Sequence, residues 1–270
     1  GFASCETKNF MPAAITYARL LCDHVYAYAK SHPNELGVDI KTQVTVDYGT
    51  KSNFEECKPQ SIHTIVVSAP CVESMSIERV RDLIGNLIDS AGLPKELYDK
   101  SKTIIYINPT GRYVNHSSLH DSGLTGRKLI VDSFGGYSPI GGGAQSSKDY
   151  TKVDRSGLYA ARYIAKNIVA AGLAKKCIVQ LSYAIGVAKP VSVSVDCMGT
   201  NLGAASDDEL SAFVLEKFPL TPRWIIDKFG LDRPGKGSFL YADVAARGQV
   251  GNDEYPWEQL DSVELFKALK

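Results

Sequence analysis

The sequence predicts an α+β protein made of two modules, each a small mixed sheet with helices packed on one face. Alternating segments and segments of helical spacing follow each other in the order β-α-β-β-α-β, and this order recurs in the second half. A length of 270 residues accommodates two domains, and 44% hydrophobic residues are ample for packed cores. We therefore expect a central module at 1–112 and a C-terminal module at 113–270.

The first half supplies one complete set of elements. An interrupted strand is expected at 1–4, and apolar residues at helical spacing predict a helix over 11–29, which stops before Pro33. The segment 41–48 alternates, so one face is buried and the other is polar enough to line a site. A strand at 61–68, a helix from Ile77 to about Gly92 and a short strand at 103–107 complete the set.

The second half repeats the order with different residues. We expect strands at 129–134, 176–185, 191–196 and 238–244, and a helix over 154–171 that stops at Gly172. Ser206 and Glu209 fit a capping box at the start of a further helix, and Thr221-Pro222 predicts one more short helix. The longer irregular segments are 49–61 and 110–127, and long ordered loops often carry function.

Composition excludes several classes of protein. Thirty Lys and Arg residues balance thirty Asp and Glu residues, so no overall field favours nucleic acid or a membrane surface. The six cysteines form no CxxC motif, which favours reduced thiols in the cytoplasm over a disulfide framework or zinc site. Neither a signal peptide nor an apolar run of eighteen residues is present. The first residue is Gly1, so we expect a segment to be missing upstream.

The segment 121–155 carries the main functional signal. It combines carboxylates and seven glycines with five cationic side chains: Arg127, Lys128, Lys148, Lys152 and Arg155. Arginine and lysine bind phosphate oxygens, glycines allow backbone N–H groups to approach an anion, and carboxylates hold Mg²⁺. The combination predicts a site for a polyphosphate with a divalent metal.

Each ingredient also has an ordinary interpretation. Arg127-Lys128 taken alone is a solvated pair, and Lys148 and Lys152 can form surface ion pairs with Asp149 and Asp154. Likewise, Lys41 taken alone is most simply a solvated lysine at the edge of a sheet. The glycine-rich stretch 135–143 is typical of a flexible turn, and it is neither a Walker A loop nor a Rossmann fingerprint.

Other candidate sites are weaker still. Tyr113 is either a packing residue or a face for stacking a base, and His116 and His120 are more simply exposed histidines than a metal pair. Ser182 and Cys177 lack a visible histidine and carboxylate arrangement, so nucleophilic catalysis has no support. The residues alone indicate an α+β protein with a polyphosphate and metal site.

Several long motifs closely resemble the methionine adenosyltransferase (S-adenosylmethionine synthetase) family in its bacterial form. They are Lys41-Thr-Gln-Val-Thr45, Asn108-Pro-Thr-Gly-Arg-Tyr113, Asp121-Ser-Gly-Leu-Thr-Gly-Arg-Lys-Leu-Ile-Val-Asp132, Gly141-Gly-Gly-Ala144, Lys148-Asp-Tyr-Thr-Lys-Val-Asp-Arg155, Val179-Gln-Leu-Ser-Tyr-Ala-Ile-Gly-Val187 and Asp253-Glu-Tyr-Pro-Trp-Glu258. The resemblance spans essentially the whole chain. It implies a fold of three similar α+β modules about a pseudo-threefold axis, with about two of them present here.

The resemblance also implies an activity, in which the methionine sulfur attacks C5′ of ATP and the released triphosphate is hydrolysed to pyrophosphate and phosphate. Carried over by motif, the catalytic cations are Lys41, Arg127, Lys128 and Lys148. The ATP-binding residues are Asp39, Lys41, Arg112, Tyr113, Asp121, Arg127, Lys128, Ala144 and Lys148. The methionine-binding residues are Asp121 and Lys152, and Asp154 is a candidate metal ligand. The family usually has Phe where Tyr113 stands, and the ring is expected to stack on adenine.

The resemblance further implies two Mg²⁺ ions per site, K⁺, and a cytoplasmic homodimer or homotetramer with active sites between subunits. Two departures qualify it. The family's Gly-Gly-Pro-x-Gly stretch is replaced by 115–120, and its first Mg²⁺ ligand, catalytic histidine and K⁺-binding glutamate precede Gly1. We therefore expect a truncated or partly proteolysed enzyme. The alternative is a fragment that binds nucleotide or assembles with other subunits without catalysis.

Overall fold

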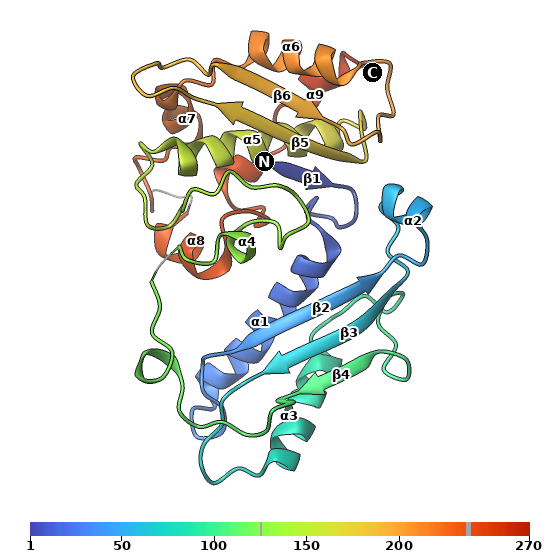
Figure 1. Ribbon diagram of the computed structural model, residues 1–270, viewed down its shortest axis with the longest axis vertical. Helices are drawn as coiled ribbons and strands as arrows, with labels where there is room; N and C mark the ends of the chain where they lie inside the picture. Colours follow the sequence, from blue (N-terminus) through green and yellow to red (C-terminus); the bar gives the residue numbers. More distant parts are fainter. Residues whose placement is uncertain (125, 236–238) are drawn as a thin grey trace. The chain divides into compact units, whose positions relative to one another are not determined.

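The computed structural model describes residues 1–124, 126–235 and 239–270, and it confirms the α+β class (Figure 1). The chain forms two compact units. The central unit comprises Ala13–Phe54 and Lys58–Leu124, and the C-terminal unit comprises Gly1–Pro12, Glu55–Cys57 and the described part of Thr125–Lys270. The first twelve residues therefore fold with the second half of the chain.

The central unit is built on a three-stranded sheet with the order β2-β3-β4. Strands β2 (Lys41–Asp47) and β3 (Ser61–Ser68) are antiparallel, and their register shifts between Thr45 and Val46. Strand β4 (Ile104–Ile107) runs parallel to β3, because helix α3 (Ile77–Ser90) provides the crossover between them. All three strands lie within one residue of the ranges that the sequence predicted.

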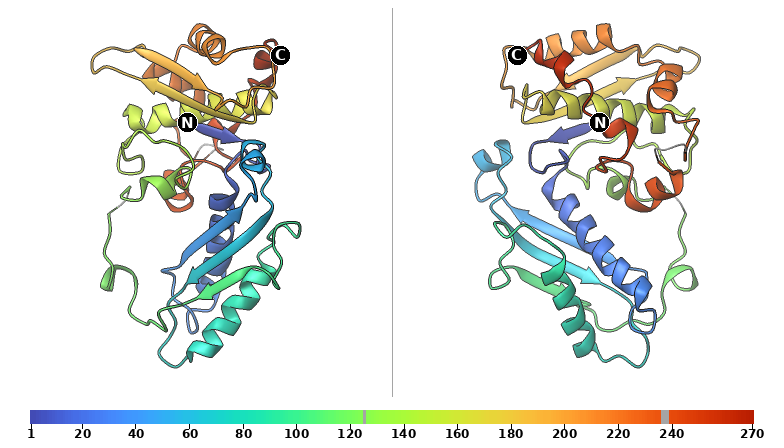
Figure 2. Two further views of the ribbon diagram at one scale, coloured as in Figure 1. Left: turned by 45° about the vertical axis from the view of Figure 1, so that its right-hand side comes forward. Right: turned by 180° about the vertical axis from the view of Figure 1, so that it is seen from behind.

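Two helices cover one face of this sheet (Figure 2). Helix α1 (Ala13–Ser31) and α3 bury their apolar stripes against β2, β3 and each other, and Leu21, Val25 and Ile84 lie fully buried there. Ser76 caps α3 by accepting a hydrogen bond from the backbone N–H of Arg79. A short helix, α2 (Lys51–Glu55), lies within the segment expected to be irregular.

The C-terminal unit contains a second three-stranded sheet with the order β1-β5-β6. Its strands are β1 (Phe2–Ser4), β5 (Lys176–Ser182) and β6 (Ser192–Asp196), all antiparallel to their neighbours. The strand at the start of the chain thus pairs with one from the second half, a partnership that local patterns could not reveal. The expected strand 176–185 ends three residues early, at Ser182.

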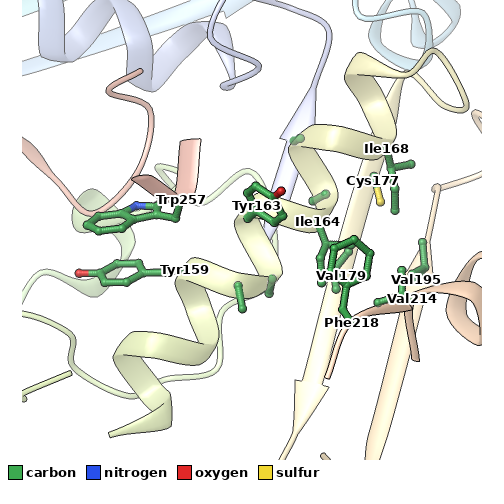
Figure 3. Packing of buried hydrophobic residues seen from close by; sticks show 14 of the residues in the cluster. Tyr159, Tyr163, Ile164, Ile168, Cys177, Val179, Val195, Val214, Phe218 and Trp257 are labelled. Carbon is green, nitrogen blue, oxygen red and sulfur yellow. The ribbon is translucent and has the colours of Figure 1, made fainter. Parts of the chain in front are cut away.

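Helix α5 (Val153–Ala170) is the centre of the C-terminal unit and is buried on almost all sides. It packs on β1 and β5, and also against α7 (Pro222–Phe229), η2 (Pro256–Glu258) and α9 (Val263–Lys267). Figure 3 shows Tyr159 of α5 lying parallel to Trp257, with ring centroids 3.8 Å apart. Helix α6 (Asp207–Lys217) lies against β6 and has the capping box expected from Ser206 and Glu209.

A buried ionic cluster ties the first residues of the chain to α5. Arg162 and Glu258 are fully buried and pair at 2.9 Å, and Lys166 lies 2.9 Å from the same carboxylate. Burial favours a higher pKa for Glu258, but the two cations outweigh it and the pKa is lowered from its ordinary value of 4.5. Arg162 also donates to the backbone carbonyls of Phe2 and Phe10. The cluster therefore holds β1 and the turn that follows it in place.

Two expected strands are helical instead. In 129–134, residues Leu129–Asp132 form the single turn α4, because Asp132 donates to the carbonyl of Lys128 and Gly135, with φ 69°, donates to that of Ile130. In 238–244, Ser238 lies outside the described residues, and Tyr241–Arg247 form helix α8, where alanines favour helix. In both segments tertiary context and local hydrogen bonds override the β propensity of branched residues.

Across the described residues, no helix is both long enough and apolar enough to cross a membrane. The six cysteines are free thiols.

Candidate active site

In the central unit, two of the expected site residues form an ion pair. Lys41 begins β2, and its Nζ lies 3.5 Å from a carboxylate oxygen of Asp121. Both side chains are 66% exposed, so the pair is solvated and contributes little to stability. An exposed cation at a strand end remains accessible to an anionic ligand.

Asp39 lies just before β2, the strand that begins at Lys41, and it contacts Tyr113. The Tyr113 hydroxyl donates to the backbone carbonyl of Asp39 at 2.9 Å, and the Asp39 carboxylate accepts from the backbone N–H of Ser117 at 3.2 Å. Burial, and then the Asp39 charge, raise the pKa of Tyr113 to about 12, so the ring stays neutral. The Tyr113 side chain is half-buried, and its hydroxyl already forms a hydrogen bond with Asp39. The accessible part of the ring is therefore what remains for contact with a ligand.

Arg112 is held by the loop that precedes α3. Its Nη1 donates to the backbone carbonyl of Met75 at 2.8 Å and to that of Glu73. These bonds orient the guanidinium while leaving its other N–H groups for a further acceptor.

The segment 115–120, which departs from the family pattern, has a defined structure. Ser117–Leu119 form the 3-10 turn η1, and His120 is exposed as expected. His116 is not exposed as expected. It is half-buried, and its ring packs so closely on Gly37 that a Cβ there would lie 2.5 Å from Nε2.

In the C-terminal unit, close packing at Gly126 brings two site segments together. A Cβ on Gly126, where φ is 79°, would lie 3.2 Å from the Ser147 hydroxyl and 3.4 Å from the Ala144 side chain. The backbone before Arg127 and Lys128 therefore lies against the turn that contains Ala144. Both cations are exposed, and neither forms an ion pair within the described parts of the chain.

Lys148 and Asp154 form a close ion pair at the start of α5. The Asp154 carboxylate also lies against the backbone of Gly143, where a Cβ would be 2.1 Å from Oδ1. Only glycine fits this position without displacement. The glycine loop, the lysine and the carboxylate thus converge at the first turn of α5, whose free N–H groups favour anions.

Lys152 immediately precedes α5, and its Nζ lies 3.3 Å from Asp149 Oδ2. Hydrogen bonds from Thr151, and then Lys152, lower the pKa of Asp149 to about 2. This pair is the ordinary surface contact that the spacing permits.

Arg155 does not belong to the cationic surface with which the sequence grouped it. Its side chain is 4% exposed, donates to the Tyr159 hydroxyl at 2.8 Å, and packs over the Tyr241 ring at 4.2 Å. Tyr159 in turn donates to Gln249 at 2.7 Å. The buried Arg155 guanidinium also donates to the backbone carbonyl of Lys148. It therefore stabilises the loop that carries Lys148.

A cavity of about 420 Å³ adjoins this loop, lined in part by Gly141, Gly143, Gln145, Asp154, Leu181 and Tyr183. Sequence reasoning missed Gln145. Its side chain is 6% exposed, its amide donates to the Gly143 carbonyl, and its buried Oε1 has no partner among the described residues. This hydrogen bond fixes the glycine loop. The sequence offered no local signal for Gln145, because it lies among glycines and polar residues.

Among the described residues, no three His, Cys, Asp or Glu side chains gather to form a preformed metal centre. Asp121 and Asp154 are each paired with a lysine instead.

Comparison with known proteins shows which family the chain resembles. One family model, the central domain of S-adenosylmethionine synthetase, matches residues 1–113, and a second, its C-terminal domain, matches 116–259. The chain belongs to the S-adenosylmethionine synthetase family. A solved structure described as an unusual S-adenosylmethionine synthetase from Campylobacter jejuni matches with a TM-score of 0.97 and 77% identity, over 100% of this chain and 70% of that one.

The family assignment confirms the resemblance read from the motifs, and members of the S-adenosylmethionine synthetase family are methionine adenosyltransferases. The match to the central-domain model ends at Tyr113, and the match to the C-terminal-domain model begins at His116.

Proposed function

We propose that this protein synthesises S-adenosylmethionine from ATP and L-methionine. The observation that carries the proposal is 77% identity over the whole chain to a solved S-adenosylmethionine synthetase. The exposed cations on both units support it, since they are suited to a polyphosphate substrate.

In the proposed reaction, the methionine sulfur attacks C5′ of ATP and the bond to the triphosphate oxygen breaks. The developing negative charge on the leaving group needs preorganised positive charge, which Lys41, Arg127, Lys128 and Lys148 would supply. Hydrolysis of the triphosphate to pyrophosphate and phosphate follows at the same cations. No protein nucleophile takes part, because alignment of sulfur, carbon and leaving oxygen is sufficient.

The lysine–carboxylate pairs support this role. Lys41 with Asp121, and Lys148 with Asp154, are partly or largely exposed pairs, which typically contribute at most about 1 kcal/mol. A polyphosphate can therefore replace the carboxylates at small cost. The released carboxylates would then accept a methionine ammonium group at Asp121 or a cation at Asp154.

The remaining assignments follow the motifs and are compatible with the local geometry. The half-buried Tyr113 ring would stack on adenine, with Arg112 and Asp39 beside it in contact with the nucleotide. The Ala144 backbone would contact ATP, and Lys152 would lie near methionine. We retain the division at 112/113 as a proposed domain boundary.

Magnesium fits Asp154 chemically, because Mg²⁺ commonly takes one or two carboxylates and completes its shell with substrate phosphates and water. When bound, it would neutralise phosphate charge. We propose two Mg²⁺ ions and K⁺ as cofactors, and a cytoplasmic homodimer or homotetramer with active sites between subunits.

The test measures product formation and nucleotide binding separately. The protein is incubated with ATP, methionine, Mg²⁺ and K⁺, and S-adenosylmethionine is quantified by mass spectrometry, while calorimetry follows a nonhydrolysable ATP analogue. We expect both product and binding. Binding without product would favour the non-catalytic alternative, and the absence of both would refute the proposal.

A further inference from the structure

Two cysteines far apart in the sequence meet at one backbone carbonyl in the C-terminal unit. The backbone N–H of Cys5 donates to the carbonyl of Lys175 at 2.9 Å, and the Cys57 thiol donates to the same oxygen at 3.5 Å. The shared acceptor makes the two side chains neighbours, and each has the largest effect on the pKa of the other.

The surroundings hold the pair in place. Cys5 follows β1 directly, and Cys57 follows α2 with a left-handed backbone, φ 56°. Glu56 forms an ion pair with Lys175 at 2.5 Å, which anchors the segment that carries Cys57. The two thiols are thus brought together by backbone and charge contacts on both sides.

The two thiols differ in access and in acidity. Cys5 is exposed, whereas Cys57 is buried. The neighbouring Cys57 thiol and the positive charge of Lys175 lower the pKa of Cys5 to about 7, against opposing effects of burial and Glu6. The proximity of Cys5, together with burial, raises the pKa of Cys57 although Lys176 opposes this. An accessible thiolate therefore lies beside a protected thiol, the arrangement typical of a redox-responsive pair.

We propose that Cys5 and Cys57 are a peroxide-reactive dithiol that closes to a reversible intramolecular disulfide. The Cys5 thiolate attacks one oxygen of a hydroperoxide, the O–O bond breaks, and sulfenic acid and hydroxide (or alkoxide) form. The Cys57 thiol then attacks the sulfenic sulfur, its proton leaves with the hydroxyl group as water, and the S–S bond forms. The hydroperoxide is reduced by two electrons and the two thiols are oxidised.

The chain contains a built-in comparison pair. Cys177 and Cys197 are also close enough for Cys197 to affect the titration of Cys177, but both are fully buried and burial strongly raises the pKa of Cys177. A protonated thiol without access to solvent reacts slowly with peroxide. Proximity alone therefore does not predict oxidation, and Cys5 with Cys57 is expected to react first.

The test is peroxide titration of the reduced protein, followed by intact mass measurement and peptide mapping without reductant. Trypsin leaves Cys57 and Cys71 on one peptide, so the map is made in the Cys71→Ser variant. We expect a loss of two hydrogens, a peptide linking Cys5 to Cys57, and reversal by dithiothreitol. Two free thiols after peroxide, or linkage of Cys177 to Cys197 instead, would overturn the proposal.

A second measurement separates reactivity from simple exposure. The rate of iodoacetamide alkylation at Cys5 should rise with pH to half its maximum near pH 7, because the thiolate is the reactive form. In Cys57→Ala, which removes the polar side chain beside Cys5, this midpoint should move to higher pH, and peroxide should leave Cys5 as sulfenic or sulfinic acid. A midpoint near 9.0 in the unsubstituted protein would contradict the assignment.

Discussion

At the residue scale, the four proposed catalytic cations make the most direct prediction. We expect Lys148→Ala and Arg127→Ala each to lower kcat by roughly 10²–10³-fold, the magnitude typical of losing one preorganised electrostatic contact. Both side chains lie at the surface, so circular dichroism and the unfolding midpoint should change little. Lys102→Ala, which removes an 83% exposed lysine in an ordinary pair with Asp99, is the matched control. Unchanged kcat in both variants would defeat the assignment.

Two neighbouring glycines offer a matched test of the loop. At Gly143 a Cβ would lie 2.1 Å from the Asp154 carboxylate, whereas at Gly141 nothing lies within 4 Å. We expect Gly143→Ala to displace Asp154 or the loop and to reduce kcat/KM at least tenfold on the scale of misplaced catalytic groups. Gly141→Ala should retain nearly full activity. Equal kinetics for the two variants would show that the loop does not position the site.

The buried cluster at Glu258 predicts a pH-dependent stability. Glu258→Gln leaves Arg162 without its counter-charge, while Lys166 keeps its ion pair with Asp253, and breaking such a buried pair typically costs about 3–5 kcal/mol. Because the folded-state pKa of Glu258 lies below 4.5, its stabilisation is present above that pH and is lost as pH falls through the folded value.

Urea unfolding at pH 7 and pH 4 checks this prediction. The difference in unfolding free energy between the protein and Glu258→Gln should be large at pH 7 and smaller at pH 4. The exposed Glu254→Gln serves as control. A difference that grows on acidification would have the wrong sign.

At the element scale, the capping box of α6 shows a signal that is complete within the sequence. The Ser206 hydroxyl accepts from the backbone N–H of Glu209, and the Glu209 carboxylate accepts from the backbone N–H of Ser206. We expect Ser206→Ala to lower the free energy of unfolding by about 1 kcal/mol, and Ser206→Thr to retain most of it. Urea unfolding would measure both, and equal losses would argue against the cap.

Other elements were not predictable from local pattern. The branched run Leu129-Ile-Val131 suggested a strand, yet it forms a helical turn whose Ile130 and Val131 are substantially exposed. Its ends are fixed by Gly135 and by the hydrogen bond from Gln249 to Asp132, a partner more than one hundred residues away. Local propensity was outweighed by a long-range contact.

At the scale of the whole molecule, the proposed active sites between subunits predict complementation. If Lys41 of one subunit works with Lys148 of another, a dimer of one Lys41→Ala and one Lys148→Ala chain contains one unsubstituted site. Random assembly should then restore roughly a quarter of the sites. Co-expression with two affinity tags, followed by S-adenosylmethionine measurement, tests this. Activity no higher than either parent would place both lysines in one subunit's site.

The sequence by itself determined the α+β class, most helices and strands, and the family. These rest on periodicity, caps and long motifs, which are encoded locally. It also found the cations of the proposed site, because charge and glycine content are visible in a short window. Only the tertiary structure decided that β1 pairs with β5, that Arg155 is a buried support, and that Cys5 meets Cys57. These are contacts between distant residues, and burial and pairing depend on the folded chain as a whole.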